Sequence, residues 1–299
     1  LDTPADISVD IVSSVTPAHD ARRFGAVAVG ANHVSWAHRS KVARWHAALE
    51  GLERPPLHLH FSGNRFSYRS LFFHLLEPLV DYHLGLNGMA LVHASAVGTE
   101  QSALAFSSLS GVGKTSLAIL LLSMGLPQFL GDEFIIVSAD GTARSFPLPL
   151  SLFHRNLVST PSLRGRLTTR ARASLTMNRV LSAVTRAVVR PRLPMGVAEI
   201  FPEVTVPRTL PLGALGYLVP THARDISIRP RAVSAEFVER LLANNHLEFR
   251  YFRRVLRAVA AARPDSPVAA HDTRIRKVLS DALSRTPCFE IAVPRRRRL

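Results

Sequence analysis

The sequence predicts an α/β fold with a central sheet, preceded by a small β-rich unit. Two observations lead to this fold class. Between residues 89 and 137, short apolar runs alternate with a helical run, which is the pattern of strands and helices that follow one another along a chain. Before residue 64, the apolar runs are short and alternate with polar residues, as in half-buried strands. The 299 residues suffice for one large domain or two ordinary ones.

The β-rich N-terminal unit is expected to span residues 1–86. Strands are predicted over the runs Ile7–Val12, Phe24–Val29 and Leu57–Phe61. A helix is predicted over Tyr68–Leu84, because apolar residues recur there at helical spacing and glycines follow. This helix is expected to connect the unit to the rest of the chain.

The second domain is expected to span residues 87–299 and to begin with an alternation of strands and helix. Strands are predicted over Met89–Val97, Ala103–Phe106 and Phe129–Val137, and a helix over Ser116–Met124. These segments predict the central sheet.

The C-terminal part of this domain is predicted to be mainly helical. Helices are expected over Ser234–Asn244, Leu247–Ala262 and Thr273–Leu283, followed by a strand over Cys288–Val293. Cys288 is the only cysteine, so it cannot form an internal disulfide, and its apolar surroundings favour a buried, inert thiol.

A glycine-containing loop connects the second predicted strand of the core to the first helix. Residues 106–115 read FSSLSGVGKT, which is an apolar strand end, a loop and the start of a helix. In such a loop the backbone N–H groups and the helix N-terminus hold phosphates, Lys114 reaches the β- and γ-phosphates, and the Thr115 hydroxyl ligates Mg²⁺. The sequence therefore predicts an ATP and Mg²⁺ site. Its expected nucleotide-binding residues are Ser108, Leu109, Ser110, Gly111, Val112, Gly113, Lys114, Thr115 and Ser116.

Two features of the loop bear on this prediction. The usual pattern G-x-x-x-x-G-K-[ST] has glycine where this chain has Ser108, so a position that eases a tight turn carries a Cβ. The chain has only three lysines among its 37 basic residues, and one of them is Lys114. A lysine retained in an arginine-dominated chain favours the phosphate-binding interpretation over a chance glycine turn.

A pair of carboxylates follows the loop helix. Asp132 and Glu133 lie in the third predicted strand, where neighbouring side chains point to opposite faces. One can therefore ligate Mg²⁺ while the other accepts the proton of an attacking hydroxyl, as phosphoryl transfer requires. The alternative is a turn-forming acidic pair.

His93 is a third catalytic candidate, together with Lys114 and the carboxylates. It lies in the strand before the loop strand, where an imidazole can orient or tune a neighbouring carboxylate. A satisfied core histidine is the alternative interpretation.

Arginines dominate one segment of the chain. Residues 141–198 contain ten arginines and no Asp or Glu, at positions 144, 155, 164, 166, 170, 172, 179, 186, 190 and 192. A helix is predicted over Ala173–Val189. Residues 157–195 are interpreted as an Arg-rich insertion. It is either a solvated or mobile segment, or it acts as a lid or dock for an acidic or phosphorylated partner.

The overall composition limits the partners. A formal net charge of +15 is compatible with nucleic acid, but no recognised nucleic-acid motif and no basic stretch interleaved with stacking aromatics support that partner, so nucleic acid is not expected. No run of 18 apolar residues predicts a membrane span, and the first residues lack the pattern of a signal peptide. A cytoplasmic protein is expected.

These features together resemble a known family. A strand with histidine, a hairpin, a loop of the Gly-x-Gly-Lys-[Ser/Thr] type, a helix ending in glycine and a tandem acidic pair resemble the catalytic domain of HPr kinase/phosphorylase and its relatives, the HPr-kinase-like serine kinases. The spacing of 21 residues from His93 to Lys114 agrees with the family. The resemblance covers residues 89–137 well and the rest of the chain weakly.

The resemblance implies a P-loop kinase core related to phosphoenolpyruvate carboxykinase, which transfers the γ-phosphate of ATP to a serine hydroxyl. It implies that Lys114 binds phosphates, that Thr115 is a metal ligand, and that Asp132 or Glu133 is the proton acceptor. Matching the motif selects Glu133, whereas counting from Lys114 selects Asp132, so both stay open as acceptor and as metal ligand. A homo-oligomer is also implied.

The chain departs from the family downstream of the acidic pair. The family has a metal-binding Glu followed by Arg-Gly-Leu-Gly, whereas residues 146–156 read FPLPLSLFHRN. The sequence thus predicts an ATP-dependent serine kinase that acts on a protein or peptide, with the segment 155–192 near the acceptor. The alternative function is a non-catalytic ATP- or ADP-binding switch that docks a partner through its arginines.

Overall fold

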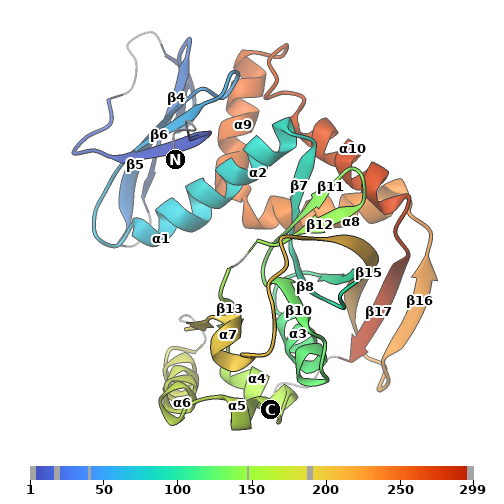
Figure 1. Ribbon diagram of the computed structural model, residues 1–299. Helices are drawn as coiled ribbons and strands as arrows, with labels where there is room; N and C mark the ends of the chain where they lie inside the picture. Colours follow the sequence, from blue (N-terminus) through green and yellow to red (C-terminus); the bar gives the residue numbers. More distant parts are fainter. Residues whose placement is uncertain (1–4, 17–20, 40–41, 147, 187–190, 295–299) are drawn as a thin grey trace. The chain divides into compact units, whose positions relative to one another are not determined.

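The structure is a computed structural model that describes residues 5–16, 21–39, 42–146, 148–186 and 191–294. The chain forms two compact units (Figure 1). The first unit comprises residues 1–88 and 246–275, and the second comprises residues 89–245 and 276–299.

The first unit contains a six-stranded sheet. Its order is β1-β6-β5-β4-β3-β2, with β1 parallel to β6 and all other pairs antiparallel. In β6, Leu57, Leu59 and Phe61 are buried while the intervening residues are half-buried, so the period-two pattern of the sequence is that of a strand with one face on a core. The strands are β1 (Ile7–Ile11), β2 (Arg22–Phe24), β3 (Val27–Val29), β4 (His33–Arg39), β5 (Arg44–Glu50) and β6 (Leu57–Gly63).

Two sequence predictions for this unit are corrected. The single strand expected over Phe24–Val29 is the hairpin of β2 and β3, because Gly25 turns the chain with a φ of 63°. Strands β4 and β5 were not anticipated, and they form the middle of the sheet. Their apolar residues are interrupted by histidines and arginines, which obscures the alternation.

Helices cover the first sheet. The expected helix over Tyr68–Leu84 is continuous through α1 (Tyr68–Leu71), the π-helical turn η1 (Phe72–Leu76) and α2 (Glu77–Leu86). Helix α9 (Arg250–Ala262) buries Phe252 in the same core as Trp45, Phe61 and Tyr82. The contact of α9 with this core explains why residues 246–275 belong to the first unit, whereas the sequence analysis placed them in the second domain.

The second unit contains a nine-stranded mixed sheet that carries both parallel and antiparallel pairs, as an α/β fold class predicts. Its main path is β10-β8-β9-β15-β12-β11-β7, and β17 pairs with both β15 and β16. The strands are β7 (Met89–Val92), β8 (Ala94–Gly98), β9 (Ala103–Ser107), β10 (Gln128–Gly131), β11 (Ile135–Ser138), β12 (Thr142–Arg144), β15 (Thr209–Thr221), β16 (Ser227–Arg231) and β17 (Cys288–Pro294).

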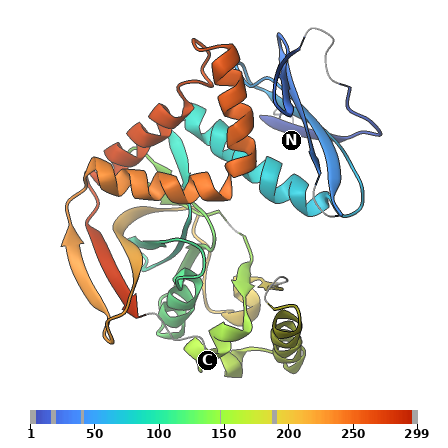
Figure 2. The ribbon, with the colours of Figure 1, turned by 180° about the vertical axis from the view of Figure 1, so that it is seen from behind.

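Strand β15 is the central strand that the sequence analysis did not anticipate. It runs parallel to β9 on one side and to β17 on the other, and its first residues pair with β12. Leu218 of β15 shares a core with Phe106 and α3 (Lys114–Ser123), while its neighbour Tyr217 contacts Phe237 of α8 (Ala235–Glu248). The two helices therefore cover opposite faces of the strands that lead to the loop (Figures 1 and 2).

Two predicted strands are each broken into two. The expected strand Met89–Val97 is β7 and β8, separated by His93, and the expected strand Phe129–Val137 is β10 and β11, separated by residues 132–134. Strands β7 and β11 pair with each other, whereas β8 and β10 pair with each other at another part of the sheet. The chain changes its pairing partner at both breaks, and the breaks place His93 and the acidic pair side by side.

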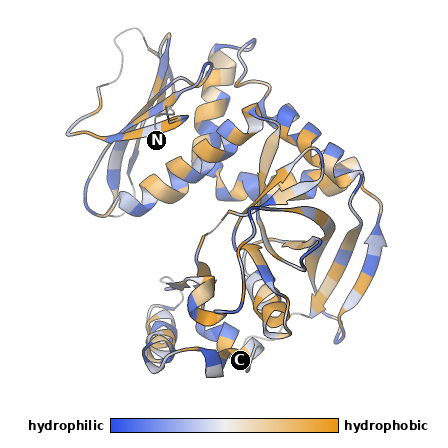
Figure 3. Ribbon diagram, viewed as in Figure 1, coloured by the Kyte–Doolittle hydropathy of each residue, from blue (hydrophilic) through white to orange (hydrophobic). Residues whose placement is uncertain are grey.

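The Arg-rich segment is part of the hydrophobic core of the second unit. It contains α4 (His154–Ser159), α5 (Leu163–Arg166) and α6 (Thr169–Val184), flanked by the paired strands β13 (Leu150–Leu152) and β14 (Leu193–Met195) and by α7 (Val197–Ile200). The side chains that it buries against α3 are Leu157, Leu163, Leu167, Ala171 and Leu175. Figure 3 shows the apolar character of α3. The segment is therefore folded and packs one apolar side on the core, while Arg164, Arg166, Arg170 and Arg172 are exposed. Residues 187–190, including Arg190 and the end of the helix predicted to Val189, lie outside the described residues.

The remaining expectations for the C-terminal part agree with the structure in their main features. Helices α8, α9 and α10 (His271–Leu283) and strand β17 occur where helices and a strand were predicted. Cys288 is buried, and burial raises the pKa of its thiol to about 11. No helix in the described ranges is long and apolar enough to cross a membrane.

Candidate functional site

The loop between β9 and α3 turns at two glycines. Gly111 and Gly113 have φ values of 88° and 133°, which side-chain-bearing residues rarely adopt, and Gly113 is the residue at which α3 begins. Ser108 is buried and is not among the described residues with a positive φ. Serine therefore fits at the position where the usual pattern has its first glycine.

Lys114 is held inside the site by two acceptors. Its side chain is buried, and Nζ donates to the Ser108 carbonyl oxygen at 3.1 Å and to His93 Nε2 at 2.9 Å. Burial, and then the lysine charge, lower the pKa of His93 to about 3. The imidazole is therefore neutral, and it accepts a hydrogen bond from the ammonium. His93 is therefore a direct hydrogen-bond partner of Lys114.

Asp132 pairs with the threonine of the loop. Thr115 Oγ1 lies 2.9 Å and 3.1 Å from the two carboxylate oxygens of Asp132. The carboxylate also accepts bonds from Ser95 Oγ at 2.5 Å and from the Ser151 backbone N–H at 3.2 Å. Asp132 is only 1% exposed. A hydroxyl and a carboxylate that meet at the start of α3 are the ligand types through which Mg²⁺ is held beside phosphates.

Glu133 lies outside regular structure, which corrects its prediction as a strand residue. It has a φ of 77°, in the left-handed region, and its backbone carbonyl accepts from the Ala94 N–H at 3.1 Å. Its carboxylate Oε1 accepts from Arg192 Nη1 at 3.1 Å, and the same nitrogen lies 3.2 Å from Ser151 Oγ. The two carboxylates therefore have different partners because the backbone turns between them. The alternation of side chains along a strand is not the cause.

Gly131 allows this turn. A Cβ at this position would lie 2.4 Å from the Phe134 carbonyl oxygen and 3.0 Å from that of Phe146. These approaches are too close for any side chain, so the chain folds back on itself directly before Asp132.

Helix α8 supports the site through two adjacent buried asparagines that the sequence analysis missed. Asn245 bridges the strand break: its Oδ1 accepts from the His93 N–H at 3.0 Å, and its Nδ2 donates to the Leu91 carbonyl at 2.5 Å. Asn244 Nδ2 donates to Ser107 Oγ at 3.2 Å, and Ser107 Oγ donates to the His93 carbonyl at 2.9 Å. The asparagine pair thus joins the loop strand to His93.

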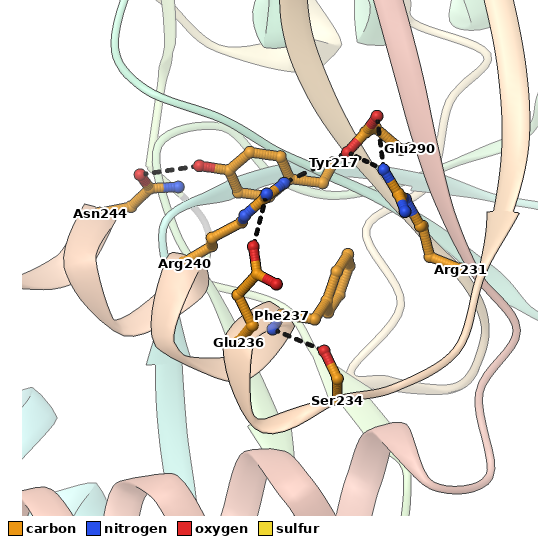
Figure 4. Close-up of polar contacts among 8 residues, drawn as sticks. All are labelled: Tyr217, Arg231, Ser234, Glu236, Phe237, Arg240, Asn244 and Glu290. Carbon is orange, nitrogen blue, oxygen red and sulfur yellow. Dashed lines mark hydrogen bonds and ion pairs between the residues drawn. The ribbon is translucent and has the colours of Figure 1, made fainter.

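The outer end of α8 carries a polar network on the same side of the sheet (Figure 4). Tyr217 of β15 donates to Asn244 Oδ1 at 3.4 Å. Glu290 of β17 binds Arg231 of β16 at 3.1 Å and Arg240 of α8 at 3.2 Å. These contacts tie α8 to β15, β16 and β17.

The structure joins five of the expected site residues in two hydrogen-bonded groups. His93, Lys114 and Ser108 form one hydrogen-bonded group, and Thr115 with Asp132 forms a second. The other expected residues are arranged differently. Glu133 bonds to Arg192, Ser116 Oγ bonds to Asn156 and Ser159 of α4, Leu109 and Ser110 are exposed, and Val112 packs on the core beside α3.

Two arginines of the Arg-rich segment lie at the site. Arg192 contacts Glu133, and Arg155 of α4 places Nη1 3.9 Å from the position that a Cβ of Gly111 would take. Arg155 also stacks on Phe153, with its guanidinium carbon 4.6 Å from the ring centroid. The segment was expected near the acceptor, but no sequence pattern singles out these two arginines.

No protein-family model matches the chain, and no curated protein matches it either.

Proposed function

We propose that the protein is an ATP-dependent kinase that transfers the γ-phosphate to a hydroxyl, most favourably that of a serine in a protein or peptide. The observation that carries the proposal is the pairing of the Thr115 hydroxyl with the Asp132 carboxylate next to buried Lys114, at the end of a glycine turn. This donor set combines the phosphate-binding and metal-binding parts of a P-loop.

The residues fit ATP and Mg²⁺. The backbone N–H groups of the loop and the N-terminus of α3 supply positive potential for the phosphates, and Lys114 adds a full charge. Thr115 and Asp132 would hold the metal, whose remaining ligands in such sites are phosphate oxygens and water. Among the described residues, no group of three or more His, Cys, Asp or Glu side chains forms a metal site of its own. This fits a metal that arrives with the nucleotide.

The contacts favour different roles for the two carboxylates. Asp132 accepts bonds from Thr115, Ser95 and Ser151, so its place is beside the metal. Glu133 is more exposed and stands outside this cluster. We therefore assign Glu133 as the proton acceptor, which the sequence left open.

The proposed reaction balances with these groups. ATP would supply the phosphoryl group, and Mg²⁺ held by Thr115 and Asp132 would neutralise its charge. The acceptor oxygen forms a bond to the γ-phosphorus while the bond to the bridging oxygen breaks, and ADP leaves with the electron pair. The hydroxyl proton goes to Glu133. The serine acceptor and the relationship to HPr-kinase-like enzymes rest on the sequence resemblance.

A non-catalytic nucleotide switch is the second candidate. It is favoured by one observation, the ion pair of Arg192 with Glu133, because a carboxylate held by arginine is a weaker base. In that function the bound nucleotide would change the affinity of the arginines for an acidic partner.

Phosphate transfer from γ-labelled ATP tests the proposal. The purified protein with Mg²⁺ and serine peptides is expected to label a peptide, and Lys114→Ala is expected to lose nucleotide binding. Glu133→Gln is expected to keep ATP binding but to lower transfer by about 10²-fold or more. Lys277→Ala is the matched control, since Lys277 is exposed and pairs with Asp281 on α10. Tight ATP binding with neither transfer nor ADP release would support the switch instead.

A further inference from the structure

Three exposed aromatic rings lie close together in the first unit. Phe66 and Tyr68 are each 52% exposed and Phe72 is 40% exposed, whereas every other Phe, Tyr and Trp of the described residues is buried or half-buried. The three rings occur in one short stretch that runs from the turn after β6 through α1 into η1 (Figure 1). Large apolar side chains that gather on a surface and stay in water mark an interaction site.

Arginines alternate with these rings. Residues 65–69 read RFSYR, a basic stretch interleaved with aromatics that the expectations from the sequence passed over. The guanidinium carbon of Arg65 lies 4.8 Å from the ring centroid of Phe66, and that of Arg69 lies 5.7 Å from the ring centroid of Phe73. Aromatic rings and guanidinium planes both stack on nucleobases, and the guanidinium also binds phosphate. The stretch therefore presents the two kinds of group that hold a nucleic-acid chain.

A hollow adjoins the first of the three rings. It has a volume of about 530 Å³ and is lined by residues of β5, of the end of β6 and of the turns beside them. Phe66 lines it together with the polar side chains of Arg44, His46 and Ser62. An aromatic ring beside polar groups can hold both the face and the edge of a base.

The turns around the hollow are fixed by Asn64. Its Nδ2 donates to the Val42 carbonyl oxygen at 2.8 Å, and its Oδ1 accepts from the Arg44 N–H at 3.4 Å. The Asn64 carbonyl oxygen accepts from Oγ of Ser67, the buried residue at which α1 begins. The backbone of both turns is therefore held in place before a ligand arrives, which lowers the cost of binding.

The charge around the hollow favours an anionic partner. Residues 21–49 contain five basic residues and residues 54–76 contain three, and neither range contains Asp or Glu. The lining of the hollow has no acidic side chain. Glu50 is the last residue of β5, whereas Arg44 is the first, so the strand separates this carboxylate from the hollow. A polyanion therefore meets arginines at the hollow and no carboxylate of its lining.

The hollow distinguishes between two polyanions that use arginines and rings. Rings that enter a lipid surface are buried at the boundary of headgroups and acyl chains, where a hollow with polar walls contributes nothing. Nucleobases stack on rings and also present polar edges, so a ring beside polar walls suits them. A single strand exposes the faces and edges of its bases, whereas a duplex hides them. The features together favour a single strand.

We propose that the first unit binds single-stranded nucleic acid at an aromatic–arginine surface. Bases stack on the rings, the guanidinium groups bind backbone phosphates, and one base occupies the hollow beside Phe66. This binding site goes beyond the proposed kinase function and does not use the ATP site of the second unit. The surface consists of Arg44, Arg65, Phe66, Tyr68, Arg69 and Phe72.

Fluorescence anisotropy of the full chain with a labelled oligo(dT) of about 20 nucleotides tests the proposal. The wild type is expected to bind it with an affinity that falls about tenfold or more between about 50 and 200 mM salt. A chain with a net charge of +15 attracts any polyanion, so polyphosphate of similar length is the comparison without bases. An excess of ATP with Mg²⁺, at equal ionic strength, is expected not to displace the oligonucleotide.

Variants of the rings separate stacking from charge. Phe66→Ala and Phe72→Ala are each expected to weaken oligo(dT) binding by about fivefold or more and to leave polyphosphate binding unchanged, because only stacking is lost. Phe66→Tyr keeps the ring and is expected to bind like the wild type. Arg65→Ala is expected to weaken binding to both polymers. Met124→Ala is the matched control, since Met124 is 71% exposed in the second unit. Urea unfolding verifies that each variant is folded.

The outcomes decide between stacking and its alternatives. A loss confined to oligo(dT) and restored in Phe66→Tyr supports the proposal. An equal loss for both polymers in Phe66→Ala, or no loss for either, would overturn it, and so would displacement of the oligonucleotide by ATP. Binding to phosphatidylglycerol vesicles that is lost in Phe66→Ala, with oligo(dT) binding unchanged, would assign the surface to lipid instead. None of these results depends on phosphate transfer, so the kinase function is tested separately.

Discussion

Lys114 and His93 form a buried pair in which only the lysine carries charge. His93 Nε2 accepts from Lys114 Nζ, so the imidazole proton lies on Nδ1. Because the pKa of His93 is lowered to about 3, first by burial and then by the lysine charge, the ring does not titrate near neutral pH. Its role is to orient the ammonium and not to transfer protons at physiological pH.

The lowered pKa of His93 predicts a pH dependence of stability. The unfolded chain takes up a proton at this residue near its ordinary pKa of 6.5, whereas the folded chain does so only near 3. The free energy of unfolding therefore falls as the pH decreases from about 6.5 toward about 3. Between pH 7 and pH 4, the free energy of unfolding of His93→Gln is expected to fall by up to about 3 kcal/mol less than that of the wild type. Urea unfolding at several pH values measures this, and parallel curves for the two proteins would contradict it.

The Thr115 hydroxyl is predicted to set the Mg²⁺ requirement. Thr115→Ala removes the oxygen that lies 2.9 Å and 3.1 Å from the Asp132 carboxylate. The Mg²⁺ concentration for half-maximal nucleotide binding is expected to rise about tenfold or more, since a hydrogen bond to a charged group contributes about 1.5–3 kcal/mol. Titration with a fluorescent ATP analogue measures the shift. Thr115→Ser keeps the hydroxyl and is expected to behave like the wild type; an equal loss in both variants would assign the effect to packing.

At the scale of elements, helix α8 holds the strand break on which the site depends. Asn245 bonds to the backbone on both sides of the junction between β7 and β8, and Asn244 bonds to the last residue of β9. Both asparagines are buried. The helix therefore fixes the position of His93 relative to the loop, although it is distant in sequence.

Asn245→Ala is predicted to weaken both stability and nucleotide binding. It removes the acceptor of the His93 N–H and the donor to the Leu91 carbonyl, and each buried hydrogen bond of this kind contributes about 1–3 kcal/mol when its partner is lost. Asn245→Asp keeps the acceptor and loses the donor. The bond from the His93 N–H is therefore expected to be retained, whereas the bond to the Leu91 carbonyl is lost. Amide hydrogen exchange of the His93 N–H measures the first bond, and the free energy of unfolding measures the loss of both bonds. Glu236→Gln, at an exposed position on the same helix, is the control that should leave both residues unchanged.

At the scale of the whole molecule, neither compact unit is a continuous stretch of chain. The first unit takes α9 from residues 246–275, and α9 inserts Phe252, Val255 and Val259 into the core around Trp45. Part of the net charge of +15 comes from the Arg-rich segment of the second unit. The apolar side chains of this segment pack on α3. A segment rich in one charge thus contributes to the core and to the site together.

The discontinuous first unit predicts that residues 1–86 do not fold by themselves. Without α9, the apolar face around Trp36 and Trp45 would be exposed to water, at a cost of about 25 cal/mol per Å². The fragment is expected to lack dispersed amide and methyl resonances in NMR spectra, whereas the full chain shows them. A cooperatively unfolding fragment would contradict this prediction.

Much of the local structure was predictable because it is encoded by neighbouring residues. The glycine turn, the lysine and the apolar run of α3 are adjacent in sequence, and they form the loop that was expected. The paired carboxylates and His93 were expected within strands, but they lie at breaks between strands. An apolar run can predict a strand, but it does not show where the chain changes its pairing partner.

The amino-acid sequence by itself determined the α/β character, the loop and the identities of the residues around it. Only the tertiary structure decided that β15 lies beside β9, that Asn245 bonds to His93 and that Arg192 holds Glu133. The two side-chain bonds join residues that are 152 and 59 positions apart in the sequence. Such pairings depend on strand register and on the packing of helices over the sheet, and no local pattern of spacing or composition records them.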